Sequence, residues 1–95
     1  MIDAIVVGTV STRVLLENTK GIRRLVVLCN KSDEDIYVNP GAPAASTLGI
    51  PLSAGGGSWT DKPDTMGWMY QGIYTAICVS GGKTLSVTEL NHGPQ

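Results

Sequence analysis

Three consecutive acidic residues, Asp33, Glu34 and Asp35, form the densest group of side chains in the sequence that could bind a cation or move a proton. A calcium loop places oxygen ligands at alternating positions and adds a bidentate acid further on, whereas these carboxylates are contiguous and no suitable acid follows them. The preceding residues, Asn30 to Ser32, have turn composition, because Asn and Ser side chains hydrogen-bond nearby backbone groups. The sequence therefore predicts a solvated turn that closes a hairpin between two strands, with weak ion binding as the alternative.

A second short motif, Gly82-Lys83-Thr84, matches the end of a phosphate-binding loop. Such a loop needs another Gly five positions before the Gly of this triplet, and a helix whose N-terminus faces the anion. Ile77 stands at that position, and the residues after Thr84 alternate as a strand does. We interpret Gly81-Gly82 as a hairpin turn.

Zinc binding and nucleophilic catalysis need residues that this chain scarcely has. A zinc site takes three or four His, Cys or carboxylate ligands at close spacing, yet the single histidine is His92 and the two cysteines, Cys29 and Cys78, are far apart in sequence. A Ser or Cys nucleophile would have only His92 as its imidazole base. We expect no catalytic, cofactor-binding or metal-binding residue.

A carboxylate pair of the glycosidase type could in principle form between acids that are distant in sequence. Nothing in the local context of the candidate acids favours such a pair, and a chain this short rarely forms a deep substrate cleft. The candidates are Asp33, Asp35, Asp61, Asp64 and Glu89.

The aromatic residues are more informative, because the chain has no Phe and its two Trp residues lie close together in sequence. Tryptophan, tyrosine and methionine are enriched at protein interfaces, which predicts a partner-binding surface. The alternative is that the Trp side chains pack over one end of the fold. The residues concerned are Trp59, Met66, Trp68, Met69 and Tyr70.

Short β-branched runs separated by Gly, Pro, Asn and Asp predict an all-β fold with no helical periodicity. We expect a single domain over residues 1–95, a small antiparallel β-sandwich with possible jelly-roll connections, one long irregular loop region from 41 to 67, and a loose tail over 90–95. Apolar residues of both parities in 22–30 predict a central strand covered on both faces. The predicted strands are 4–7, 13–16, 22–29, 35–38, 47–52, 58–60, 72–79 and 84–90.

Charge and hydropathy exclude several classes of function. The net charge is −1 and the basic residues are scattered, which argues against nucleic acid as a partner. No apolar run is long enough for a membrane-spanning helix, and Asp3 with no basic residues before the first apolar run argues against a secretory signal. We expect a chain made in the cytosol, with both cysteines reduced and buried, although sequence leaves open that they face each other.

The order of segments resembles small structural proteins of tailed bacteriophages. The likeness lies in an arginine-led apolar strand ending in Asn (24–30), the sequence SDEDIYV (32–38), the glycine corner GIPLSAGG (49–56), the strand GIYTAI (72–77) and the terminal LSVTEL (85–90). It covers about three quarters of the chain and is a pattern of moderate specificity. The segment 58–72 is richer in aromatic residues than those proteins lead us to expect.

The resemblance implies a non-enzymatic β-sandwich component of the virion, in which Ile36 and Val38 enter the core and the glycine corner lets the chain cross between sheets. It implies capsid decoration or stabilisation as the function, with other virion proteins and further copies of the chain as partners, and no cofactor. The aromatic loop residues and the two chain termini would make the contacts. The alternative is a carbohydrate- or receptor-binding module of a phage tail or fibre, in which the same aromatic residues stack on sugar rings.

Overall fold

The computed structural model describes residues 2–19, 21–41, 43, 49–66 and 68–91, which form eight β-strands and no helix. Each predicted strand overlaps an observed one; for the predicted strand 47–52, residues 47 and 48 lie outside the described residues. Within the described ranges nothing forms a helix long and apolar enough to cross a membrane. The strands are β1 (Ile2–Val7), β2 (Thr12–Leu15), β3 (Arg23–Asn30), β4 (Ile36–Pro40), β5 (Ile50–Leu52), β6 (Gly57–Asp61), β7 (Tyr74–Ile77) and β8 (Lys83–Asn91).

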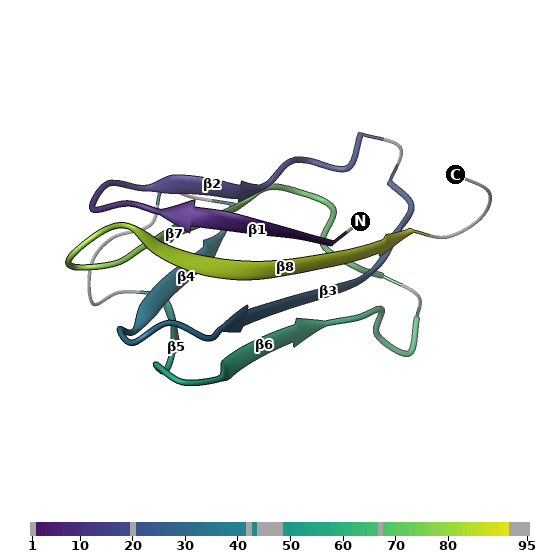
Figure 1. The fold of residues 1–95 in the computed structure, drawn as a ribbon. Helices are drawn as coiled ribbons and strands as arrows, with labels where there is room; N and C mark the ends of the chain where they lie inside the picture. Colours follow the sequence, from purple (N-terminus) through teal and green to yellow (C-terminus); the bar gives the residue numbers. More distant parts are fainter. Residues whose placement is uncertain (1, 20, 42, 44–48, 67, 92–95) are drawn as a thin grey trace.

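Two antiparallel sheets of four strands each pack face to face, in the orders β1-β8-β3-β6 and β2-β7-β4-β5 (Figure 1). The pairing is nested: the first strand pairs with the eighth, the second with the seventh, the third with the sixth and the fourth with the fifth. This is the jelly-roll arrangement. The predicted β-sandwich is confirmed, and β3 is an interior strand between β8 and β6.

Nested pairing sends most connections from one sheet to the other, which corrects two predicted hairpins. The Gly81-Gly82 turn joins β7 to β8, and the segment 31–35 joins β3 to β4; in both cases the two strands lie in different sheets. Both glycines have positive φ, 75° and 69°, which sharpens the change of direction. Turn residues of this kind serve a hairpin and a corner equally well, so the local sequence does not distinguish them.

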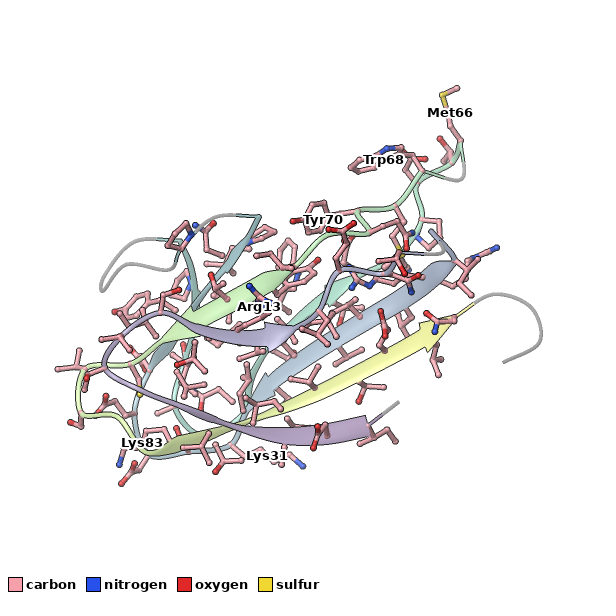
Figure 2. The ribbon with its side chains drawn as sticks, turned by 90° about the horizontal axis from the view of Figure 1, so that it is seen from above. Arg13, Lys31, Met66, Trp68, Tyr70 and Lys83 are labelled. Carbon is pink, nitrogen blue, oxygen red and sulfur yellow. The ribbon has the colours of Figure 1, made fainter. Side chains whose placement is uncertain are left out.

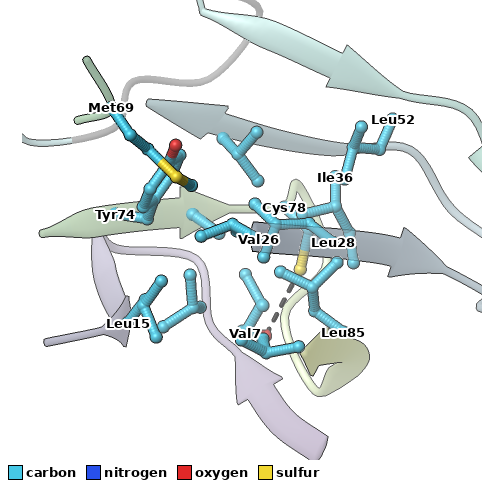
Figure 3. Packing of buried hydrophobic residues seen from close by; sticks show 14 residues of the cluster. Val7, Leu15, Val26, Leu28, Ile36, Leu52, Met69, Tyr74, Cys78 and Leu85 are labelled. Atoms are coloured by element: carbon cyan, nitrogen blue, oxygen red, sulfur yellow. Dashed lines mark hydrogen bonds between the residues drawn. The ribbon is translucent and has the colours of Figure 1, made fainter. Parts of the chain in front are cut away.

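The core lies between the sheets and is built from alternate residues of each strand, as the pleat requires. Ile36 and Val38 are fully buried, as expected, together with Val26 and Leu28 of β3 (Figure 3). Cys78 is also in this core, with its thiol 3.3 Å from the Val7 carbonyl oxygen. Cys29 is a free, half-buried thiol on β3, one position from the inward-facing Leu28, so the two cysteines do not face each other.

Strand β3 is covered on one face, not on both as the sequence predicted. Its inward residues are buried, whereas Leu25, Val27 and Cys29 alternate with them and are only half-buried. The second sheet packs on one side of the first, and nothing within the described chain covers the other side.

The end of β8 also differs from expectation. The strand continues through Leu90 and Asn91, so these two residues are not part of a loose tail, and the rest of the predicted tail, residues 92–95, lies outside the described residues. Leu90 is 51% exposed, whereas the inward position after Val87 is held by Glu89. A carboxylate on the core side of a strand needs a partner, and that partner organises one end of the molecule.

Candidate partner-binding site

The segment between β6 and β7 exposes two large apolar side chains that lie close together in one turn. Met66 is 90% exposed and Trp68 is 67% exposed, and both point away from the sandwich (Figure 2). We call these two residues the tip. Most of the surface of both side chains stays in water, so packing within this chain does not explain their presence.

Asp64 fixes the shape of the tip. Its Oδ1 accepts the backbone N–H of Met66 at 2.9 Å and that of Trp68 at 3.0 Å. Its own backbone N–H donates to the Trp68 carbonyl at 3.0 Å. An aspartate in this role mimics a backbone turn. The two tip side chains therefore project from a closed turn and not from an open loop.

After the tip the chain returns directly to the core. Met69 is buried in the core cluster, and Tyr70 is partly buried against it. The Tyr70 hydroxyl donates to the Ile73 carbonyl at 2.9 Å, and its ring meets the Tyr74 ring edge to face, with centroids 5.5 Å apart. A side chain at Gly72 would collide with the Tyr70 hydroxyl, which explains the glycine there.

The buried guanidinium of Arg23, at the start of β3, holds this returning chain. Its Nη1 donates to the carbonyls of Tyr70 and Gly72 at 3.1 and 2.8 Å, and its Nη2 donates to the Leu16 carbonyl at 2.9 Å. Its Nε lies 2.7 Å from Glu89 Oε2, and the Arg23 side chain is 0% exposed. The planar fork of arginine can serve several acceptors at once, so one side chain ties two loops and strand β8 together.

A β-bulge explains why an arginine points inward here. The register between β3 and β8 shifts between Arg23 and Leu25, so Arg24 is an extra residue and Arg23 lies on the core side. The Gln71 side chain completes the anchor: it accepts the Arg23 N–H at 2.7 Å and donates to the Arg23 carbonyl at 3.0 Å. The pairing of Arg23 with Glu89 was not predicted from the sequence. The available signal was that Glu89 continues the inward-facing series of Leu85 and Val87.

Trp59 belongs to the core rim and not to the tip. It lies on edge strand β6 and packs partly against the core. Its buried Nε1 makes no hydrogen bond of good geometry with any described residue, although its proximity to the Tyr74 hydroxyl acts to lower the pKa of that group. That hydroxyl donates to Asp61 Oδ2 at 3.1 Å, and burial is the main cause that raises the pKa of Tyr74 to about 12.

The five residues predicted to bind a partner therefore do not form one exposed surface. Met69 lies in the core, and Trp59 and Tyr70 are partly buried against it, because Trp59 lies on β6 and the chain after the tip returns to the core. Met66 and Trp68 remain as the candidate contacts.

At the opposite end of β3, the buried side chain of Asn30 holds a second set of loops. Its Nδ2 donates to the carbonyls of Glu34 and Leu52, both at 2.8 Å. Its Oδ1 accepts the Ser32 backbone N–H at 3.0 Å and the Ser32 hydroxyl at 2.6 Å. The Asn30 carbonyl also accepts the Gly56 N–H at 2.7 Å, so two connections are fixed to one strand end.

The three acidic residues at this end separate instead of converging. Asp33 pairs with Lys83 at 2.7 Å, Glu34 accepts the Ser80 N–H at 2.7 Å, and Asp35 accepts the Ala54 N–H at 2.9 Å. The hydrogen bond from Lys83 is the first cause that lowers the pKa of Asp33, whose side chain is 82% exposed. The predicted solvated turn is confirmed, and the described residues contain no group of three ligands that could hold a metal ion.

A shallow depression of about 350 Å³ lies beside this corner, between Lys31 and Lys83. Lys83 is already paired with Asp33 there. A salt-bridged lysine and exposed hydroxyls do not provide the base, nucleophile and oxyanion donors that a reaction site requires.

Comparison of the chain with protein-family models, with curated proteins and with solved structures gives no match.

Proposed function

We propose that this protein is a non-enzymatic structural component of a bacteriophage virion that stabilises the capsid by binding another virion protein through its tip. The observation that carries the proposal is the exposure of Met66 and Trp68 on a closed turn that is followed directly by the buried Met69. Tryptophan is the residue most enriched among those that dominate binding energy at interfaces. Methionine adapts its shape to an irregular apolar pocket.

The anchoring of the tip supports binding by a preformed surface. Asp64 closes the turn through two backbone N–H groups, and Arg23 holds the carbonyls of Tyr70 and Gly72. A loop that is already ordered loses less conformational entropy on association, which leaves more of the contact energy as affinity.

The virion assignment rests on the resemblance of the segment order to small phage structural proteins. Jelly rolls occur in viral shells and also in lectins, so the fold alone does not choose between the two settings. Ile36, Val38 and the glycine corner occupy the structural positions which that resemblance implies. The separation of Asp33, Glu34 and Asp35 onto three different partners supports a role without catalysis.

A carbohydrate- or receptor-binding module of a phage tail or fibre is the second candidate. The exposed indole of Trp68 favours it, because an aromatic face can stack on a sugar ring. Met66, the other tip residue, fits an apolar protein pocket better than a hydroxyl-rich ligand. We therefore place the protein partner first.

The test is co-sedimentation of the purified protein with undecorated capsids. We expect binding at a saturating, fixed copy number, which the Trp68→Ala variant loses without a change in melting temperature. Val79→Ala is the control, since Val79 is 65% exposed but follows β7 at the Asn30 end. Asp64→Ala is expected to weaken binding about tenfold, because the turn is no longer closed before contact.

Three results would contradict the proposal: no binding of the unaltered protein to capsids, equal binding by the Trp68→Ala and Val79→Ala variants, or binding to a glycan array that depends on Trp68. The last result would transfer the assignment to the carbohydrate-binding module.

A further inference from the structure

The outer face of the sheet β1-β8-β3-β6 carries two transverse rows of side chains that differ in size. The strand register places the four members of each row side by side across the sheet. One row, the ridge, consists only of β-branched residues, and the adjacent row, the groove, consists only of smaller ones. The ridge is Ile2, Thr88, Val27 and Thr60, and the groove is Ala4, Ser86, Cys29 and Ser58.

None of these eight side chains carries a formal charge, and all are exposed or half-buried. Charged residues lie before and after the two rows along the strand direction, with Arg24 before the ridge and Lys31 and Asp33 after the groove. Ile2 is 79% exposed. A partner with charges on its contacting surface would have to desolvate them against this face without compensation.

We propose that a second copy of this chain packs on this face, related by a two-fold axis that lies parallel to the sheet and perpendicular to the strands, between ridge and groove. This operation places the ridge of each copy over the groove of the other. It also places each strand over its own equivalent, so the spacing of about 4.8 Å between side chains in a row matches on both sides. A symmetric dimer needs this kind of self-complementary surface.

This arrangement also places apolar side chains against apolar ones and hydroxyl groups against hydroxyl groups. Along the ridge, apolar Ile2 and Val27 alternate with hydroxyl-bearing Thr88 and Thr60. Along the groove, Ala4 and Cys29 alternate with the two serines in the same strand order. Ile2 therefore meets Ala4 of the second copy, and Thr88 meets Ser86, which lets apolar contacts and hydroxyl contacts form separate stripes.

The area of the face determines how stable we expect the dimer to be. Four strands at about 4.8 Å spacing and the paired length of β1 give a face of about 19 by 20 Å. Two such faces have a combined area of about 760 Å², which is below the range of stable specific interfaces and is typical of a weak one. We expect a dimer that dissociates on dilution, with a dissociation constant in the range of about 1–100 µM.

The axis reverses the strand direction, so the two Arg23 ends of the dimer point in opposite directions. Each copy then presents its tip at a different end of the assembly. If the tip binds a virion protein as proposed above, one dimer connects two such proteins. The pairing of the faces itself does not depend on that function.

The test is the mass of the full chain by sedimentation equilibrium over a range of concentrations. The unaltered protein is expected to pass from monomer to dimer, and Ser86→Lys to raise the dissociation constant about a hundredfold, since it fills the groove and brings like charges together. Ser80→Lys, an exposed serine outside the face, is the matched control and is expected to change the constant less than about twofold.

A mixture supplies the specific check on the axis. Ser86→Lys and Thr88→Glu are each expected to be monomeric alone, but an equimolar mixture is expected to dimerise, because the introduced ammonium and carboxylate groups face each other across the axis. If Ser86→Lys lowers the melting temperature, Thr60→Lys on the ridge replaces it, with Thr9→Lys as its exposed control.

Three outcomes would overturn the proposal: a monomer at all concentrations up to about 1 mM, a trimer or larger assembly, or equal effects of a face variant and its control. None of these outcomes involves capsids, so failure here is distinguishable from failure of tip binding.

Discussion

A buried polar side chain anchors loops at each end of β3, but the anchored loops at the two ends differ in the side chains that they expose to solvent. Arg23 at one end and Asn30 at the other are buried polar side chains that collect the carbonyls of neighbouring loops. At the Asn30 end, the collected loops also bond to each other, because the Gly55 N–H donates to the Ser32 carbonyl at 2.9 Å. At the Arg23 end, the held segment projects Met66 and Trp68 into solvent.

This difference shows that anchoring a loop does not require exposing apolar surface. The Asn30 end fixes its two connections with polar side chains, glycines and Ala54, and the exposed Val79 at that end lies outside those connections. The Arg23 end adds two large apolar side chains, Met66 and Trp68, that contribute nothing to the anchor. The tip is therefore an addition to the fold, which is why we assign it a binding role. The anchors can be tested separately from the tip.

The largest effect is expected from Arg23→Ala. The change leaves Glu89 on the core side without its 2.7 Å partner and removes donors from three loop carbonyls, which is expected to lower the free energy of unfolding by about 3–5 kcal/mol. Urea denaturation followed by tryptophan fluorescence measures it. The exposed Arg13→Ala is the control, and a similar loss in both variants would mean that the buried network is not the cause.

Asn30→Ala is expected to cost less, about 2–3 kcal/mol, because the groups left unpaired are neutral. The carbonyls of Glu34 and Leu52 lose their donor, and Leu52 is in the core. The same urea experiment applies, with the exposed Asn30-end residue Val79→Ala as the control. If Asn30→Ala proved more harmful than Arg23→Ala, the ranking of the two anchors would be reversed.

Alkaline pH is expected to weaken the Arg23 end selectively. Burial raises the pKa of Tyr74 to about 12, from about 10 in the unfolded chain. The folded state therefore holds this proton more tightly, so the stabilisation is complete below pH 10 and is lost as the pH rises through about 12, by about 2 kcal/mol. Urea midpoints measured in steps of about 1 pH unit between pH 9 and 12 test this loss of stability.

Tyr74→Phe is the control for that titration. The variant loses the hydrogen bond to Asp61, so it starts less stable, but its stability should fall less steeply in the same pH interval. Parallel curves for the two proteins would assign the alkaline loss to other groups.

The smallest effect is expected at the Asn30 end from Asp33→Asn. The Asp33 carboxylate is mostly in solvent although it lies 2.7 Å from Lys83, and water and salt screen such a pair. No resolvable change in the urea midpoint is expected at physiological ionic strength. A clear loss of stability, absent at high salt, would show that this ion pair helps to hold the corner.

The strands could be predicted from sequence because their signal is local. Alternation in Leu85, Ser86, Val87 and Thr88 reflects one wet face and one buried face, whatever strand lies alongside. The sheet to which each strand belongs is a non-local property: Gly81 and Gly82 permit a hairpin and a crossing equally well. The predicted hairpins were therefore wrong where the predicted strands were right.

The candidate site was predictable only in part for the same reason. The composition of the loop pointed to Met66 and Trp68, but also to Met69, because exposure depends on which side chain of an irregular segment turns inward. Arg23 and Glu89 are 66 residues apart, and strict alternation along β3 would have placed Arg24 on the core side, whereas the bulge places Arg23 there. No local pattern records that pairing.

Nested strand pairing also has a consequence for how the chain reaches its structure. Among the eight described strands, β4 and β5 are the only consecutive ones that pair with each other. Every other pair must therefore close a longer loop, and the first strand, β1, pairs with the last, β8. Loop closure of that kind slows folding. During synthesis β1, with Ile2 and Val6 on its surface, emerges before its only sheet neighbour exists. It must wait, unpaired, until β8 has left the ribosome, which makes that interval the period of greatest aggregation risk.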